Sequence, residues 1–278
     1  MIELAPQHKI GLSLSNPVMI AAGCAGYGQA YHNLLDLAVF GAIVTNPITL
    51  RPRRGPAQPR LAETPGGFIL NTGEQNLGVK KVIQQAQKSW TSLSTAIIAH
   101  LPADEPDDLL RTARALAHLE TPQGQNVLAA IELGLPSQAH PQEARRWIRA
   151  IQEGSPLPLL VKLPLGTSLD LAEVVAEAQV DALVIGSPPQ GAAAQAGRSG
   201  AIIRGVLYGP ALHSLALHDL QRVKNWLDLP IVAVGGIHSL ADAETFLAAG
   251  ATAVQLDSLL FIEPKQAESI AKHLNSTG

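Results

Sequence analysis

The sequence predicts an α/β fold, a single closed (β/α)8 TIM barrel. Eight short, nearly continuous apolar runs recur along the chain, and each is followed by a helix-length amphipathic stretch. Apolar runs of this kind are typical of parallel strands that are buried on both faces. The length of 278 residues is also ordinary for one such barrel. An open doubly wound sheet is the structural alternative.

The apolar runs set the expected strands, and the amphipathic stretches set the expected helices. We expect strands at residues 17–22, 41–45, 95–99, 127–133, 157–163, 181–185, 230–234 and 251–256. We expect helices at residues 29–40, 78–89, 105–118, 142–152, 169–178, 214–227, 240–249 and 265–275. The N-terminal segment 9–15 is expected to form a short hairpin across the barrel bottom.

Several helix starts carry capping signals. The segments 167–170 and 239–242 both match a capping box, with a hydroxyl residue first and an aspartate three positions later. Pro141 and Pro264 suit first helical turns, where the missing N–H has no intrahelical partner.

Two connections are too long to be simple turns. Residues 46–77 follow the second expected strand and are rich in Pro, Arg and Gly, and residues 186–213 follow the sixth and are rich in Gly and Ala. Both leave the carboxyl ends of strands, where barrel active sites are built. No change in composition indicates a second domain, so residues 1–278 are expected to form one domain.

Composition narrows the functional classes. Hydrophobic residues make up 46% and charged residues 15%, with a net charge of −3, so no basic surface for nucleic acid is expected. Cys24 is the only cysteine, which excludes an internal disulfide and a CxxC metal knuckle. The N-terminus lacks the pattern of a secretory signal, and no apolar run is long enough for a membrane span. We therefore expect a cytoplasmic protein without a membrane or nucleic-acid partner.

Motifs along almost the whole chain share one order. They are Asn16-Pro17 through Ala22-Gly23, Gly41 to Thr45, Thr49 through Asn71 and Asn76 to Gly78, Gly209-Pro210-Ala211, Gly235-Gly236-Ile237, and Gly250 to Gln255. Together they resemble the dihydroorotate dehydrogenase family, nearest its soluble class 1 members. The resemblance implies an FMN oxidoreductase of pyrimidine biosynthesis that oxidises dihydroorotate to orotate. In that family a hydride moves to flavin N5 and a loop Cys or Ser takes a proton.

The resemblance also implies a set of cofactor contacts at the barrel mouth. The FMN-binding residues would be Ala22, Gly23, Thr45, Lys162, Gly209, Gly235, Gly236 and Ser258. Lys162 would stabilise the negative charge that reduction leaves on the flavin, although it could instead be an ion-pair partner for a carboxylate. Gly235 and Gly236 would hold the FMN phosphate, or they could simply make a tight turn.

Departures from the family pattern gather at the same mouth. Asp257 stands where the family has a glycine of the phosphate cradle. A carboxylate there would repel the phosphate by several kcal/mol at an effective dielectric of about 20. That cost disappears if Asp257 turns outward to cap the following helix. Asn46 replaces a lysine after the second strand, so a cation near flavin and substrate is missing.

The substrate side departs as well. The loop after the fourth strand is shortened to residues 134–138 and holds no cysteine, which leaves Ser137 as the candidate catalytic base or as an ordinary loop serine. Ser187-Pro188 replaces Asn-Thr after the sixth strand. Of the amides that bind the pyrimidine in the family, only Asn71 and Asn76 match, and both are candidate substrate-binding residues.

A few other residues have two interpretations. His100 and His238 could face the mouth and suggest a weak metal site, or they could be polar packing residues. Cys24 is interpreted as a packing residue because no basic neighbour activates it. The arginines of the strand-two loop could steer an anion, remain solvated or form a homodimer contact; they are Arg51, Arg53, Arg54 and Arg60.

Three functions remain open from sequence. The leading one is a dihydroorotate dehydrogenase-like, FMN-dependent oxidoreductase acting on CH–CH groups of a pyrimidine-like small molecule, with weak or changed substrate use. The second is a non-catalytic barrel homologue that acts through partner or ligand binding. The third is a barrel enzyme that uses another phosphorylated ligand without redox chemistry.

Overall fold

Eight parallel strands close into a barrel in the computed structural model, which describes residues 1–194 and 202–276. They are β3 (Val18–Ile20), β4 (Ala42–Val44), β7 (Ala96–Pro102), β8 (Ala130–Gly134), β9 (Leu159–Pro164), β10 (Ala182–Ser187), β13 (Ile231–Val234) and β14 (Ala253–Leu256). Their order around the barrel is their order in the chain, with β14 pairing β3 to close it. The expected barrel is confirmed, and the open sheet is excluded.

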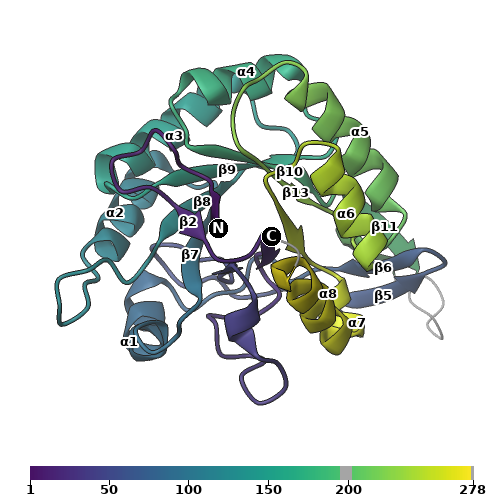
Figure 1. The fold of residues 1–278 in the computed structure, drawn as a ribbon, viewed down its shortest axis with the longest axis horizontal. Helices are drawn as coiled ribbons and strands as arrows, with labels where there is room; N and C mark the ends of the chain where they lie inside the picture. Colours follow the sequence, from purple (N-terminus) through teal and green to yellow (C-terminus); the bar gives the residue numbers. More distant parts are fainter. Residues whose placement is uncertain (195–201, 277–278) are drawn as a thin grey trace.

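Helices surround this barrel on the outside (Figure 1). They are α1 (Val79–Trp90), α2 (Pro106–Ala117), α3 (Pro141–Gly154), α4 (Leu169–Glu177), α5 (Leu212–Lys224), α6 (Leu240–Ala248), α7 (Leu259–Ile262) and α8 (Pro264–Ser276). The capping box expected at residues 239–242 is confirmed, because Ser239 and Asp242 bond each other's backbone N–H. The box expected at residues 167–170 is wrong: Ser168 caps α4 and accepts a hydrogen bond from the N–H of Leu171. Each apolar helix face packs onto the strands and extends one continuous core.

The helix expected at residues 29–40 is wrong. That segment consists of turns followed by a 3-10 helix over Leu37–Val39 (η1). Asp36 has extended backbone, and its carboxylate accepts a hydrogen bond from the N–H of Ala38 at 3.1 Å. Aspartate favours this local bond over helix propagation, so a new short element starts at residue 37 instead of continuing an α-helix.

The N-terminal hairpin exists, but its strands lie further apart in the chain than residues 9–15. β1 (Ile2–Glu3) pairs antiparallel with β2 (Ser13–Leu14). The Glu3 carboxylate closes the connection by accepting hydrogen bonds from the N–H groups of Ala5 and Leu12. Residues 6–8 of this hairpin share a cavity with the starts of β10, β13 and β14, which confirms its place at the bottom of the barrel.

The two long connections form a second sheet beside the barrel mouth. β5 (Leu61–Thr64) and β6 (Gly67–Leu70) come from the first connection, and β11 (Gln190–Ala194) and β12 (Ile202–Tyr208) come from the second. They pair in the order β11-β12-β6-β5, with β5, β6 and β11 visible at one side of the barrel in Figure 1. Residues 195–201 of the second connection lie outside the described residues.

One aromatic cluster connects this added sheet to the barrel. Phe68 stacks on Tyr208 with ring centroids 5.4 Å apart, and Phe261 of α7 meets both rings edge-on. Such arrangements contribute beyond simple area burial, so the added sheet is held firmly over one side of the mouth. Among the described residues, no helix is long and apolar enough to cross a membrane.

Candidate active site

A cavity of about 310 Å³ opens at the carboxyl ends of the barrel strands. Its barrel walls come from His100 of β7, Gly134 of β8 and Lys162 of β9, and Tyr208 of the added sheet contributes to the opposite side. This is the place where (β/α)8 barrels build their active sites, and the volume suits a small molecule. We refer to this cavity as the mouth pocket.

A chain of buried polar side chains crosses the barrel beneath the mouth pocket. Lys162 Nζ donates to Gln255 Oε1 at 3.0 Å, and Gln255 Nε2 donates to Glu132 Oε2 at 2.6 Å. Glu132 Oε1 then lies 2.9 Å from Nδ1 of His100 and 4.0 Å from Lys162 Nζ. These four residues come from β9, β14, β8 and β7, so the network joins opposite sides of the barrel.

Electrostatics keep Glu132 ionised within this network. Burial by itself raises the pKa of the Glu132 carboxyl, but the charge of Lys162 and the hydrogen bonds from His100 and Gln255 outweigh burial and lower the pKa to about 2. A buried carboxylate and a buried ammonium therefore balance each other. The ion-pair interpretation of Lys162 is confirmed, and its place in the pocket wall leaves it able to meet a ligand as well.

Asp257 is buried at the end of β14 and does not face solvent. Its Oδ1 accepts hydrogen bonds from the backbone N–H of Ser258 at 2.5 Å and from the Ser258 hydroxyl at 3.0 Å. Its Oδ2 is buried without a hydrogen-bond partner among the described residues. Burial raises the pKa of the Asp257 carboxyl, against the lowering effect of the bonds from Ser258 and the charge of Lys162.

The family model for dihydroorotate dehydrogenase matches residues 5–277. The chain belongs to the dihydroorotate dehydrogenase family. Similar proteins include the catalytic subunits of dihydroorotate dehydrogenase B (NAD(+)) from Geotalea uraniireducens, at 31% identity over 96% of this chain and 90% of the relative, and from Trichlorobacter lovleyi, at 33% identity over 94% and 89%.

The ring end and the phosphate end of FMN would meet different surroundings in this member of the dihydroorotate dehydrogenase family. Ala22, Gly23 and Lys162 line the mouth pocket, so the ring end of a flavin would meet small residues and a cation. At the phosphate end, the N–H of Ser258 already donates to Asp257. A phosphate needs that donor and is repelled by the carboxylate, so this end does not fit FMN as arranged.

The other residues that the dihydroorotate dehydrogenase pattern predicts to contact FMN include Thr45, Gly209, Gly235 and Gly236. Thr45 is buried, and its hydroxyl accepts a hydrogen bond from the backbone N–H of His100. Gly235 and Gly236 both have positive φ, and a Cβ on Gly236 would lie 2.3 Å from the N atom of His213 at the start of α5. Gly209 is also left-handed, beside β6. The tight-turn interpretation of the two glycines therefore holds, and their cofactor role stays a prediction.

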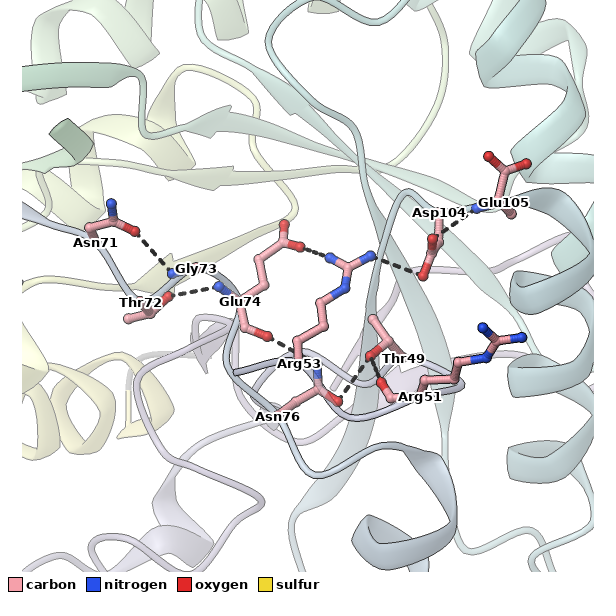
Figure 2. Close-up of polar contacts among 10 residues, drawn as sticks. All are labelled: Thr49, Arg51, Arg53, Asn71, Thr72, Gly73, Glu74, Asn76, Asp104 and Glu105. Atoms are coloured by element: carbon pink, nitrogen blue, oxygen red, sulfur yellow. Dashed lines mark hydrogen bonds and ion pairs between the residues drawn. The ribbon is translucent and has the colours of Figure 1, made fainter. Parts of the chain in front are cut away.

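The two candidate substrate amides stabilise the strand-two loop (Figure 2). Asn71 Oδ1 accepts from the N–H of Gly73, and Asn76 Oδ1 accepts from the hydroxyl of Thr49 at 3.0 Å. Neither amide lines the mouth pocket, whereas the neighbours Thr72 and Glu74 do. The substrate roles of Asn71 and Asn76 remain predictions.

Two of the four arginines of the strand-two loop have side-chain or backbone partners among the described residues. Figure 2 shows Arg53 between Glu74 and Asp104, paired with both carboxylates, the second at 2.9 Å. Arg60 donates to the backbone oxygen of Pro56 and to the side chain of Gln75. These two arginines therefore hold the loop together, which leaves Arg51 and Arg54 as the candidates for an anion or partner contact.

Ser137, the candidate base, lines the rim of the mouth pocket and is exposed. No hydrogen bond of its hydroxyl activates it in the described part of the chain.

His238 lies outside the pocket wall, with Nε2 2.8 Å from the Ser258 hydroxyl. Among the described residues, no group of three or more His, Cys, Asp or Glu side chains could hold a metal ion. Burial raises the pKa of the Cys24 thiol, in agreement with a packing role.

Sequence reasoning missed Glu132 and Gln255, which complete the buried network with His100 and Lys162. Glu132 stood inside an apolar strand run, and a charged residue in a strand buried on both faces needs a partner. That signal was available, but the partner could not be named before the barrel brought β7, β9 and β14 together. Tyr208 was missed too, because its ring enters the mouth from the added sheet.

Proposed function

We propose that this protein is a dihydroorotate dehydrogenase-like, flavin-dependent oxidoreductase with changed substrate use, acting on a CH–CH bond of a small ring compound in the mouth pocket. The observation that carries the proposal is Lys162, a buried cation in the pocket wall of a chain that belongs to this family. A cation there stabilises the charge that reduction leaves on a flavin. FMN would supply the hydride acceptor.

The described residues around the mouth pocket have different roles in this proposal. Lys162 supplies positive charge, while Glu132 holds it in position through Gln255. Leu70, Tyr208 and Phe261 form an apolar side of the pocket, which limits water around a bound ring. The phosphate end contributes little affinity because Asp257 occupies the N–H of Ser258. We therefore propose weak FMN binding that rests mainly on the ring.

The test is the visible spectrum of the purified protein after incubation with FMN and removal of free flavin. Retained yellow colour that a cyclic CH–CH compound bleaches without oxygen supports the proposal. The variant Lys162→Met should weaken flavin retention, whereas Lys265→Met is a control, because Lys265 is an exposed lysine that pairs with Glu268 and does not line the mouth pocket. A protein that stays colourless at every FMN concentration tested rejects the proposal.

One observation favours the second function, a non-catalytic homologue that acts through ligand binding. The buried Asp257 removes a phosphate donor at the cradle position, and such a loss suits a barrel that has given up its cofactor. Binding of a small pyrimidine such as orotate to a colourless protein, measured by calorimetry, would support this function over the first.

A further inference from the structure

The side chain of His100 has one occupied and one free ring nitrogen. Nδ1 lies 2.9 Å from Oε1 of Glu132, and Nε2 has no hydrogen-bond partner among the described residues. An ionised carboxylate can only accept a hydrogen bond, so the neutral ring carries its proton on Nδ1. Its Nε2 is then a proton acceptor.

The free nitrogen belongs to the mouth pocket. His100 is in the pocket wall, and its side chain is 12% exposed although Glu132 behind it is fully buried. The opening therefore reaches the ring but not the carboxylate. A ligand in the pocket meets His100 first, and Glu132 acts only through it.

The neighbouring strand is shaped for this ring. Gly134 has no side chain, and a Cβ there would lie 2.7 Å from Cε1 and 3.2 Å from Nε2 of His100. Any other residue would push against the edge that carries the free nitrogen. Gly134 does not adopt a positive φ, so the room it leaves for the imidazole, and not its backbone conformation, explains the glycine.

The other candidate acceptor in the pocket is less well prepared. Ser137 is exposed at the rim, and no hydrogen bond of its hydroxyl links it to a base in the described part of the chain. A serine hydroxyl takes a proton only when a neighbour activates it. A carboxylate orients the histidine, whereas no described residue hydrogen-bonds to the serine side chain.

We infer that His100 is the residue that accepts a proton from the substrate in the mouth pocket, with Glu132 as its positioning residue. The substrate class, a ring compound with a C–H next to a carbonyl, rests on the proposed function. In this step the C–H bond breaks, its proton bonds to Nε2, and its electron pair moves to the carbonyl oxygen as an enolate. The reverse step returns a proton to carbon, so no oxidant is needed.

Deuterium exchange tests the inference without redox turnover. Dihydroorotate is incubated in D₂O at millimolar concentration, which offsets the weak recognition expected of this ring, with the protein as purified and without oxygen or added acceptor. Proton NMR follows the C–H next to the ring carbonyl. We expect wild-type protein to exchange it faster than buffer and His100→Asn to be slower by at least about 100-fold. The matched control His118→Asn, at an exposed histidine outside the mouth pocket, should exchange like wild type.

Three results would overturn the inference: exchange no faster than buffer, wild-type exchange in His100→Asn, or an equal loss of exchange in His118→Asn. Two further measurements guard against misfolding of the histidine variant. Nitrogen NMR of wild-type protein should show the proton of His100 on Nδ1, and Glu132→Gln should weaken that preference; a proton on Nε2 contradicts the inference. Imidazole added to His100→Ala should restore part of the exchange.

The outcome is separable from the proposed function, because flavin retention is read from the visible spectrum and exchange is read by NMR. A yellow protein whose exchange ignores His100 keeps the oxidoreductase and removes this acceptor. A colourless protein that exchanges through His100 keeps the acceptor and removes the oxidoreductase.

Discussion

The carboxylate of Asp257 accepts a hydrogen bond from the backbone N–H of the next residue, Ser258, at 2.5 Å. The amide that a phosphate would use is therefore already bonded to a carboxyl oxygen within the same chain. Asp257→Gly should free that N–H and remove the charge, so FMN affinity should rise by at least about tenfold, or about 1.4 kcal/mol.

Fluorescence quenching of FMN measures the affinities. Asp257→Asn is the matched variant, because it removes the charge but keeps an oxygen beside Ser258, and it should fall between wild type and Asp257→Gly. Equal affinity in all three proteins would show that the weak point lies elsewhere, with Asn46 the next candidate because its buried Oδ1 also lacks a partner in the described part of the chain.

The fold could be predicted from the sequence more completely than the site, and the reason is physical. Apolar runs report burial directly, so the eight strands and most helices were found. The helix expected at residues 29–40 failed where a side-chain bond of Asp36 starts a short 3-10 helix instead. The site depends on which strands meet across the barrel. Lys162 could be named alone, but its partners Glu132 and Gln255 lie 30 and 93 residues away in sequence, and no periodicity reports such a contact.

Turnover of dihydroorotate itself should be very slow. The loop 134–138 holds no cysteine, Asn46 is uncharged, and the amides of Asn71 and Asn76 are bonded within their own loop. A site that has lost most of its hydrogen bonds to a ring loses recognition by orders of magnitude. Reduction of a dye acceptor measures the rate, and turnover above about one per second would contradict this interpretation of the substitutions.

Removal of the buried cation should destabilise the fold. Lys162→Met leaves the Glu132 carboxylate buried without its charge partner, and breaking a buried pair in this way costs roughly 3–5 kcal/mol of unfolding free energy. The double variant Lys162→Met/Glu132→Gln removes both charges and should recover much of the loss. Urea unfolding followed by circular dichroism measures both, and equal stability of the two variants would argue against the pair.

Acid should weaken the fold through Glu132. Its folded pKa of about 2 lies below the ordinary value of 4.5, so the folded state favours the carboxylate. The resulting stability is present above pH 4.5 and is lost as the pH falls toward 2, by roughly 3 kcal/mol in total. Urea midpoints between pH 7 and pH 3 should fall more steeply in wild type than in Glu132→Gln. Parallel curves would assign the acid sensitivity to other groups.

Asn76 offers a test between a structural and a substrate role. Its Oδ1 accepts from the Thr49 hydroxyl at 3.0 Å and from the N–H of Gly78 at 2.8 Å, and its Nδ2 donates to the Glu74 backbone oxygen at 2.9 Å. The residue is 6% exposed, so Asn76→Ala leaves buried partners unpaired and should lower the unfolding free energy by about 1–3 kcal/mol.

The matched variant is Asn71→Ala, because Asn71 is less buried and makes two bonds, to the Arg204 backbone oxygen and from the N–H of Gly73. It should cost less, within about 1 kcal/mol. Urea unfolding gives the stability of each, and ligand titration with orotate gives the affinity. If Asn76→Ala unfolds like wild type but loses orotate binding, the amide serves the substrate, and the loop bonds drawn in Figure 2 are not its main role.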